Sequence, residues 1–275
     1  MNKINKYTWF PTEPVVESPP KPSEILYSFP KIFIFGFCTL IALILLIFTK
    51  AGSLKSWRPY ILKYWAQLAL FLCSLRVVCS GNFLKHGVIV SNHISWIDIL
   101  VIMSRCPAIF VAKSEVRNWP IIGHLSKLVD TIFIERDPKD VKDQVAILHE
   151  KVMENKLLIL FPEGTSTDGF RILPFNTSLF EFPFVKKINK PKRLEVQSLT
   201  IFYDCDVNLE RDFFAWYHSR TLITHIIKVL GNRHKSIIHL DFGAAHNYKN
   251  FDDRKKLAKF LFQEVSVNFK KYVCG

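Results

Sequence analysis

Short apolar runs alternate with helical patterns along most of the chain. Runs typical of buried strands, rich in β-branched and aromatic residues, cover Gly87–Val90, Ala108–Ala112, Thr131–Glu135, Leu157–Phe161, Gln197–Tyr203 and Ile237–Phe242. Apolar spacings of three and four predict helices that begin at Ser95 and Asp137. Two more helices are predicted over Arg211–Leu230 and Asp252–Tyr272. Strands that alternate with helices predict an α/β fold, in which a largely parallel sheet is flanked by helices.

The first eighty residues follow a different pattern. Six prolines and no apolar period predict a disordered tail over residues 1–30. Ile32–Thr49 contains no charge and is just long enough for a helix that crosses a membrane. Tyr60–Val78 predicts a second apolar helix with a polar stripe, which is typical of a membrane interface. The expected organisation is therefore a tail (1–30), a two-helix membrane anchor (31–80) and a globular domain (82–275).

The basic residues around the two anchor helices give no orientation, because Lys and Arg are equally frequent on both sides. Lys50, Lys55 and Arg58 lie between the helices, where charge opposes transfer across a bilayer. A hairpin that dips into one leaflet is the favoured arrangement, and one or two complete spans are the alternative.

The net charge of +13 indicates an anionic partner, either a nucleic acid or an acidic membrane surface. No aromatic-basic repeat or known nucleic-acid-binding motif is present, so we expect membrane lipids and no nucleic acid. The basic run between Lys186 and Arg193 is a candidate contact for anionic headgroups. The six cysteines form no C-x-x-C pair, which is typical of a reducing compartment.

The candidate catalytic residues lie at the ends of two predicted strands. Ser91, Asn92 and His93 interrupt the first strand before a helix, and this is the edge of a parallel sheet at which α/β proteins bind ligands. Asp98 follows in the first helical turn, close enough to hold the His93 imidazole as a general base. Ser95 and Asp98 also fit a helix-capping pair, which would need no histidine.

The strand Leu157–Phe161 leads into Pro162, Glu163, Gly164 and Thr165, so a second polar turn is available for a composite site. A metal ion bound by His93, Asp98 and Glu163 is an alternative, but one histidine with two carboxylates is a weak ligand set, and we predict no metal. The absence of G-x-S-x-G, a P-loop and G-x-G-x-x-G from the sequence argues against serine hydrolases and these nucleotide-binding classes.

Four segments, in order, resemble the motifs of glycerolipid acyltransferases, the 1-acylglycerol-3-phosphate O-acyltransferase superfamily with its H-x4-D motif. They are Asn92–Asp98, Thr131–Arg136, Phe161–Thr165 and Leu173–Phe175. Lys113–Glu115 and Trp119–Gly123 also resemble the stretch that follows the first motif. The resemblance implies an enzyme on a cytoplasmic membrane face, with a two-helix anchor and the family's sheet.

The implied reaction moves a fatty acyl group from acyl-CoA or acyl carrier protein, without another cofactor, to the hydroxyl of a lysolipid. His93 is the expected base and Asp98 its supporting carboxylate. Glu163 resembles the carboxylate that orients the substrate, and backbone N–H groups near Gly164 and Thr165 are candidate oxyanion donors.

Arg136 is the candidate phosphate clamp, with Lys113 or Arg171 as a second cation. An intact Phe-Ile-x-Arg segment favours 1-acyl-sn-glycerol-3-phosphate as acceptor, with phosphatidate for phospholipid biosynthesis as product. Two features point elsewhere. The basic residue that many phosphatidate-forming members carry after Thr165 is replaced by Ser166, and Phe213–Tyr217 with His225 resembles a branch that acylates lyso-ornithine lipid. Acylation of lyso-ornithine lipid or another lysophospholipid is the alternative, and a catalytically silent membrane-bound lipid-binding protein is the non-enzymatic one.

Overall fold

The computed structural model describes residues 17–49, 56–118, 126, 130–134, 141–184 and 194–273. Within these residues seven strands form one sheet, in the order β1-β7-β6-β2-β5-β3-β4. The strands are β1 (Leu75–Ser80), β2 (Gly87–Ser91), β3 (Ile109–Lys113), β4 (Ile132–Ile134), β5 (Leu157–Leu160), β6 (Glu195–Asp204) and β7 (Ser236–Asn247). Neighbouring strands are parallel except β6 and β7. The predicted α/β fold with a largely parallel sheet is confirmed.

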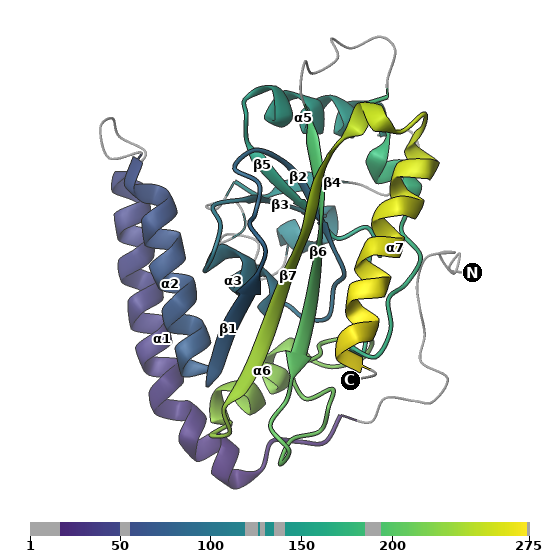
Figure 1. Ribbon diagram of the computed structural model, residues 1–275. Helices are drawn as coiled ribbons and strands as arrows, with labels where there is room; N and C mark the ends of the chain where they lie inside the picture. The colour runs from purple at the N-terminus through teal and green to yellow at the C-terminus, as the bar shows by residue number, and fades with distance from the viewer. Residues whose placement is uncertain are drawn as a thin grey trace, which may run out of the picture.

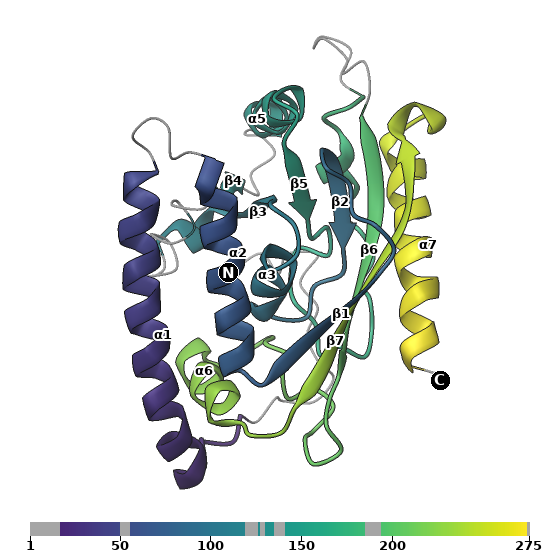
Figure 2. The same cartoon turned by 60° about the vertical axis from the view of Figure 1, so that its left-hand side comes forward.

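Helices cover both faces of this sheet (Figure 1). They are α1 (Pro22–Phe48), α2 (Arg58–Leu72), α3 (Ile97–Met103), α5 (Val141–Met153), α6 (Leu222–Gly231) and α7 (Arg254–Val273), with short 3-10 helices at Ser114–Asn118, Thr177–Phe180 and Tyr248–Asn250. Figure 2 shows α7 on one side of the sheet, with α1, α2 and α3 on the other.

The strand β2 lies between two hydrophobic cores. Ile89 packs in a core that includes residues of α2, α3 and α6, whereas Val88 and Val90 pack in a core that includes residues of α5 and α7. Burial on both faces explains why this strand is apolar at successive positions. The rigid strand ends at the turn that contains His93.

All six predicted strands are present among the described residues, and the last continues to Asn247. The strand β1 was missed, because the sequence predicted a helix through Val78. That prediction is wrong beyond Leu72: Ser74 has a φ of 60° and turns the chain into β1, which pairs with β7. The sheet therefore begins inside the segment that we assigned to the anchor.

The helix α1 also starts earlier than predicted. Pro22 occupies its first position, where no hydrogen-bond donor is needed, and Pro30 lies inside the helix. The prediction that prolines preclude a helix as far as residue 30 is thus wrong for Pro22–Pro30, and residues 1–16 lie outside the described part. Gly231 of α6 lies so close to this end of α1 that a Cβ on it would be 2.3 Å from the Glu24 carbonyl oxygen.

Of the described helices only α1 is long and apolar enough to cross a membrane. Its 27 residues span about 40 Å, and the apolar 18-residue stretch has a mean hydropathy of 2.7 and is 11% buried. The predicted two-helix anchor is therefore corrected to one candidate anchor helix among the described residues. The helix α2 runs beside α1 (Figures 1 and 2) but is shorter, and its Ala66, Ala69 and Leu70 belong to the protein core.

The long helix predicted over Arg211–Leu230 is wrong for its first half, because only α6 (Leu222–Gly231) is helical there. Arg220 binds the carbonyl oxygens of Asp212 and Ala215 and the Asp212 carboxylate. Side-chain bonds to backbone groups compete with helix formation, so these residues form a compact loop instead. This loop lies against the turn after β2. The helices predicted from Asp137 and over Asp252–Tyr272 correspond to α5 and α7, although Asp137 itself lies outside the described residues.

Candidate active site

The turn that follows β2 is fixed to the neighbouring strand β6. Asn92 is buried, its Oδ1 accepts a hydrogen bond from the Ile201 N–H at 2.8 Å, and its Nδ2 donates to the Ile201 carbonyl oxygen at 2.9 Å. These two bonds extend the strand pairing beyond the end of β2. His93 therefore starts from a backbone position that the sheet holds in place.

The predicted contact between His93 and Asp98 is present. The His93 Nδ1 lies 2.8 Å from the Asp98 Oδ2, and the imidazole stacks on the Phe161 ring with a centroid distance of 4.3 Å. Because a carboxylate oxygen faces Nδ1, that nitrogen carries the proton and Nε2 keeps its lone pair. The His93 side chain is 21% exposed, so the lone pair can reach a substrate hydroxyl.

Asp98 is fully buried and accepts hydrogen bonds from four donors. Its Oδ2 accepts from the backbone N–H groups of Ile94 and Ser95, at 2.7 and 3.0 Å, as well as from His93. Its Oδ1 accepts from the Tyr203 hydroxyl at 2.6 Å. The carboxylate thus holds the imidazole and the backbone of the turn at the same time.

The capping pair that the sequence left open is only half formed. The Asp98 carboxylate accepts from the Ser95 N–H, but the buried Ser95 hydroxyl has no partner among the described residues. The helix α3 begins at Ile97, with Trp96 as its N-cap. The prediction of Ser95 as N-cap is wrong. The same carboxylate performs both the local capping role and the contact with His93.

Tyr203 was not identified from the sequence. It lies near the end of β6, and burial beside the Asp98 carboxylate raises the pKa of its hydroxyl well above the usual value. The hydroxyl therefore stays protonated and donates to Asp98 at any physiological pH. An aromatic residue with a hydroxyl at the carboxyl end of a parallel strand next to β2 was the signal that could have revealed it.

Tyr203→Phe should lower kcat about threefold to tenfold without a comparable change in KM, because Asp98 loses one donor while the substrate loses none. Initial rates over a range of acceptor concentrations separate the two parameters. Tyr248→Phe is a matched control, since the Tyr248 hydroxyl is also buried but has no hydrogen-bond partner in the part of the chain that the structure describes. Equal effects of both substitutions would contradict the role of Tyr203.

Glu163 joins the second polar turn to the first. Its Oε1 accepts from the His93 N–H and its Oε2 from the Leu173 N–H, both at 2.7 Å. Burial raises the pKa of Glu163 to about 8, against the opposing effect of these two donors. The side chain thus fastens the third and fourth sequence motifs to the backbone of the histidine turn.

The loop after Glu163 makes further contacts with that turn. The Thr167 N–H donates to the His93 carbonyl oxygen at 3.0 Å. Gly164 has a φ of 71°, and its N–H closes a tight turn onto the Phe161 carbonyl oxygen. In this conformation the Gly164 N–H is engaged within the turn, and the choice of oxyanion donors stays a prediction.

The loop before α6 closes the other side of the turn. The Trp216 N–H donates to the Ile94 carbonyl oxygen at 3.0 Å, and the Trp216 carbonyl oxygen accepts from the Ser166 hydroxyl at 2.5 Å. The Trp96 Nε1 donates to the His225 Nδ1 at 2.9 Å. His225, which the sequence analysis noted only for its resemblance to the lyso-ornithine lipid branch, thus links α6 to the start of α3.

Comparison with known proteins identifies the family. The family model described as Acyltransferase matches residues 76–184, which include His93, Asp98 and Glu163. The lyso-ornithine lipid O-acyltransferase of Rhodobacter capsulatus is 33% identical over 208 residues, which are 75% of each chain. The chain belongs to the glycerolipid acyltransferase superfamily. This confirms the resemblance that its motifs carry.

Two further relatives differ in how much of the acyltransferase they match. The lyso-ornithine lipid O-acyltransferase of Rhizobium meliloti is 33% identical over 221 residues, 77% of this chain and 74% of its own. The 1-acyl-sn-glycerol-3-phosphate acyltransferase of Neisseria gonorrhoeae is 33% identical over 98 residues, 35% and 38% of the two chains. These names support acyl transfer to a lysolipid and leave its headgroup open.

The fold of the acyltransferase also matches a solved structure. The crystal structure of the 1-acyl-sn-glycerophosphate acyltransferase PlsC from Thermotoga maritima aligns with a TM-score of 0.62, covering 90% of this chain and 94% of that one. At 16% identity the likeness concerns the fold alone.

The structure of the acyltransferase brings together His93, Asp98 and Glu163, with Gly164 and Thr165 in the adjoining loop. Arg136 and the side chain of Lys113 lie outside the described part, as does the basic run 186–193. Arg171, proposed as a second cation, is paired with Asp168. Among the described residues no group of three or more His, Cys, Asp or Glu could hold a metal.

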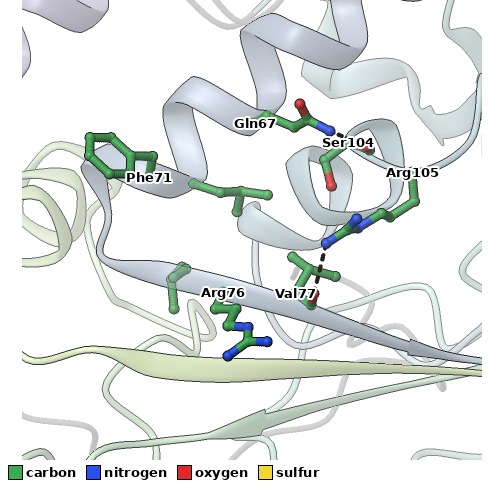
Figure 3. Close-up of a pocket in the computed structure, with 8 residues that line it drawn as sticks. Gln67, Phe71, Arg76, Val77, Ser104 and Arg105 are labelled. Atoms are coloured by element: carbon green, nitrogen blue, oxygen red, sulfur yellow. Dashed lines mark hydrogen bonds between the residues drawn. The ribbon is translucent and has the colours of Figure 1, made fainter.

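A cavity of about 310 Å³ lies elsewhere in the acyltransferase, between α2, β1 and the end of α3 (Figure 3). Gln67, Phe71 and Ser104 are among its lining residues, and the Arg105 Nη2 donates to the Val77 carbonyl oxygen at 2.7 Å. None of the predicted site residues that the structure describes lines it. The cavity is therefore separate from the His93 turn.

His225 makes the stability of the acyltransferase depend on pH. Burial lowers the pKa of His225 from 6.5 to about 4, and the neutral ring accepts from Trp96 and donates to the Phe213 carbonyl oxygen. The unfolded chain binds a proton below pH 6.5 that the folded chain excludes until about pH 4. The contribution of neutral His225 to the free energy of unfolding is therefore fully present above pH 6.5. It falls by about 3 kcal/mol as the pH drops to 4.

Urea unfolding in detergent, followed by tryptophan fluorescence from pH 7.5 to 4, measures this dependence. His225→Gln should lower stability at neutral pH but reduce the slope between pH 6.5 and 4 by about one proton. Identical slopes in the two proteins would contradict the assignment to His225.

Proposed function

We propose that the acyltransferase transfers a fatty acyl group from a thioester donor to the free hydroxyl of lyso-ornithine lipid, with His93 as the general base. The observation that supports the reaction is the His93–Asp98 contact at 2.8 Å, which fixes the tautomer with Nε2 as proton acceptor. The acceptor is supported by the two lyso-ornithine lipid O-acyltransferases that match three quarters of this chain.

In the proposed reaction the acceptor hydroxyl gives its proton to the His93 Nε2 while its oxygen attacks the thioester carbonyl carbon. The new C–O bond forms a tetrahedral oxyanion, and the adjacent Asp98 carboxylate stabilises the imidazolium. Collapse of the oxyanion breaks the C–S bond, and the imidazolium returns the proton to the leaving sulfur. The reaction therefore needs neither a covalent enzyme intermediate nor a further cofactor.

The donor in this proposal is acyl-CoA or an acyl carrier protein, and the active site faces the cytoplasm from the inner membrane. The apolar helix α1 and the membrane lipid acceptor support the membrane location. Five free cysteines among the described residues agree with the reducing side of that membrane.

The test is an acylation assay with purified enzyme in mixed micelles, with both donors and a panel of lysolipid acceptors. We expect the highest kcat/KM with lyso-ornithine lipid. A preference of tenfold or more for 1-acyl-sn-glycerol-3-phosphate would overturn the choice of acceptor but keep the reaction. Binding of the lysolipids without turnover of any of them would instead support a catalytically silent lipid-binding protein.

The second candidate acceptor is 1-acyl-sn-glycerol-3-phosphate, which the segment Phe133–Arg136 favours because it matches the family's second motif. If a phosphate is held there, Arg136→Ala should raise the KM of that acceptor about tenfold to a hundredfold, the loss of one charged hydrogen bond. The same substitution should leave a phosphate-free acceptor unaffected.

A further inference from the structure

The cavity between α2, β1 and the end of α3 combines apolar walls with one guanidinium. Leu70 and Phe71 of α2 and Leu75 and Val77 of β1 supply the apolar part of its lining. Arg105, which follows α3, is partly buried and extends from the end of that helix toward β1 (Figure 3). Apolar walls beside a fixed cation suit an amphiphile that has an anionic headgroup.

The Arg105 side chain keeps hydrogen-bond donors available. Its Nη2 donates to the Val77 carbonyl oxygen at 2.7 Å, and its Nε is buried without a hydrogen-bond partner among the described residues. No carboxylate in the described part of the chain forms an ion pair with it. A guanidinium carries five N–H donors in a geometry that matches phosphate oxygens, and a buried donor without a partner calls for an acceptor.

The other polar groups of the lining do not compete for such a ligand. The Gln67 Nε2 donates to the Ser104 carbonyl oxygen at 3.2 Å, so this carbonyl at the end of α3 is already engaged. Arg76 is also among the lining residues, but its side chain lies on the opposite side of β1 from Arg105 (Figure 3), as expected for a strand residue next to Val77. Of the two arginines in the lining, only Arg105 points to the space between α2 and β1.

A thiol on the same face of β1 lies close to this guanidinium. Cys79 follows Val77 by two residues, so the two side chains share a face of the strand. Partial burial raises the pKa of the exposed Cys79 thiol, and the positive charge of Arg105 opposes this rise. The reactivity of Cys79 therefore reports on an anion that binds Arg105.

One face of α2 leads from the cavity along the helix that runs beside α1. Trp57, Tyr60, Tyr64 and Phe71 are all exposed, and their spacings of three, four and seven place them on one face. Phe71 is both the last member of this face and a lining residue of the cavity. Trp and Tyr are enriched where a bilayer meets water, so the cavity lies at the end of a surface suited to the membrane interface.

We propose that this cavity binds one anionic phospholipid of the bilayer, with the lipid phosphate at Arg105 and its hydrocarbon along Leu70 and Phe71. The unpaired guanidinium attracts a net negative headgroup, whereas the ammonium of a zwitterionic phospholipid brings a second positive charge to the same place. The site lies at the C-terminal end of α3, about 9 Å along the helix from Asp98 in its first turn. The proposal is therefore independent of the acceptor that the His93 turn acylates.

Binding is tested with the full-length protein in a neutral detergent, without acyl donor, by titration with dioctanoyl phosphatidylglycerol or dioctanoyl phosphatidylcholine. Thermal unfolding measures binding, and the maleimide labelling rate of Cys79, followed by mass spectrometry of its peptide, locates it. Phosphatidylglycerol should raise the Tm and slow the labelling of Cys79, with a half-saturating concentration about tenfold below that of phosphatidylcholine.

Two arginines on opposite sides of β1 provide a matched pair of variants. Arg105→Gln should raise the half-saturating concentration of phosphatidylglycerol about tenfold, to that of phosphatidylcholine, because the charged hydrogen bond is lost. Arg76→Gln removes the same charge nearby and should change this concentration less than about twofold, since an exposed charge outside the site contributes little.

Two further variants keep the test decisive if loss of the Val77 contact prevents Arg105→Gln from folding. Arg105→Lys keeps the charge without the fork and should give a half-saturating concentration between those of wild type and the glutamine variant. Phe71→Ser changes an exposed side chain and should weaken the binding of both lipids alike, because it removes only hydrocarbon contact.

Several outcomes overturn the proposal. Equal binding of both lipids by wild type, or equal losses in Arg105→Gln and Arg76→Gln, means that no specific anion site exists at Arg105. Binding of phosphatidylglycerol that leaves the labelling rate of Cys79 unchanged places the lipid elsewhere. If inorganic phosphate slows the labelling of Cys79 at the same concentrations as the lipid, the site binds soluble phosphate and not a phospholipid.

Discussion

His93→Ala lowers the rate of acyl transfer about 10²–10⁴-fold, because the acceptor hydroxyl loses the only base that the site places at the end of β2 in the described structure. The side chain is 21% exposed and packs against Phe161, so its removal leaves the core of the protein intact. Circular dichroism and membrane association should stay at wild-type values. Release of free thiol from the donor, with and without acceptor, measures the loss.

His86→Ala is the matched control for this substitution. His86 is exposed and immediately precedes β2, at the opposite end of the strand from His93. Its removal should leave kcat within about twofold of wild type, since it is exposed and lies at the far end of the strand from the turn. Near-normal turnover of His93→Ala would rule out the proposed base, whatever the acceptor.

Asp98→Asn should lower kcat about 10²–10⁴-fold while the acceptor KM changes little. Three N–H donors face Oδ2, so the amide oxygen of asparagine must point to them, and its NH2 group then faces the Tyr203 hydroxyl. The turn and the histidine tautomer are retained, but the negative charge that stabilises an imidazolium is lost. Removal of that charge is the main cause of the expected effect.

The fold of Asp98→Asn must be verified, since the side chain is fully buried. Its thermal unfolding in detergent gives that check. The Tyr203 hydroxyl can accept from the new NH2 group, so a combined Asp98→Asn and Tyr203→Phe protein should unfold more easily than either single variant. A higher acceptor KM with an unchanged kcat would contradict the role of Asp98 in the chemical step.

Six of the seven described strands and the turn that contains His93 could be predicted from sequence because their signals are local. The run Gly87–Val90 is apolar on both faces, and the break at Ser91–His93 marks the end of the strand. His93 and Asp98 are five residues apart, so the geometry of one turn already brings them together. The motifs of the family, which also predicted Glu163, depend on this local order.

The errors arose where a distant contact overrides a local pattern. The apolar stretch from Tyr60 to Val78 has a helical composition, yet β7 offers a sheet edge on which Leu75–Ser80 pairs as β1. In the loop before α6, the bonds of Arg220 to Asp212 and Ala215 replace the helix that the spacing predicts. The burial of one face of α2 against the core likewise depends on residues that follow it in the chain.

By itself, the sequence determined the α/β class, the superfamily and the contact between His93 and Asp98, because each follows from a short-range pattern or a motif. Only the tertiary structure decided which groups surround that pair. Tyr203 is 105 residues from Asp98, and Glu163 is 70 residues from the backbone N–H of His93 that it accepts. Such contacts depend on which strands become neighbours in the sheet, and the local pattern of a strand does not specify its neighbour.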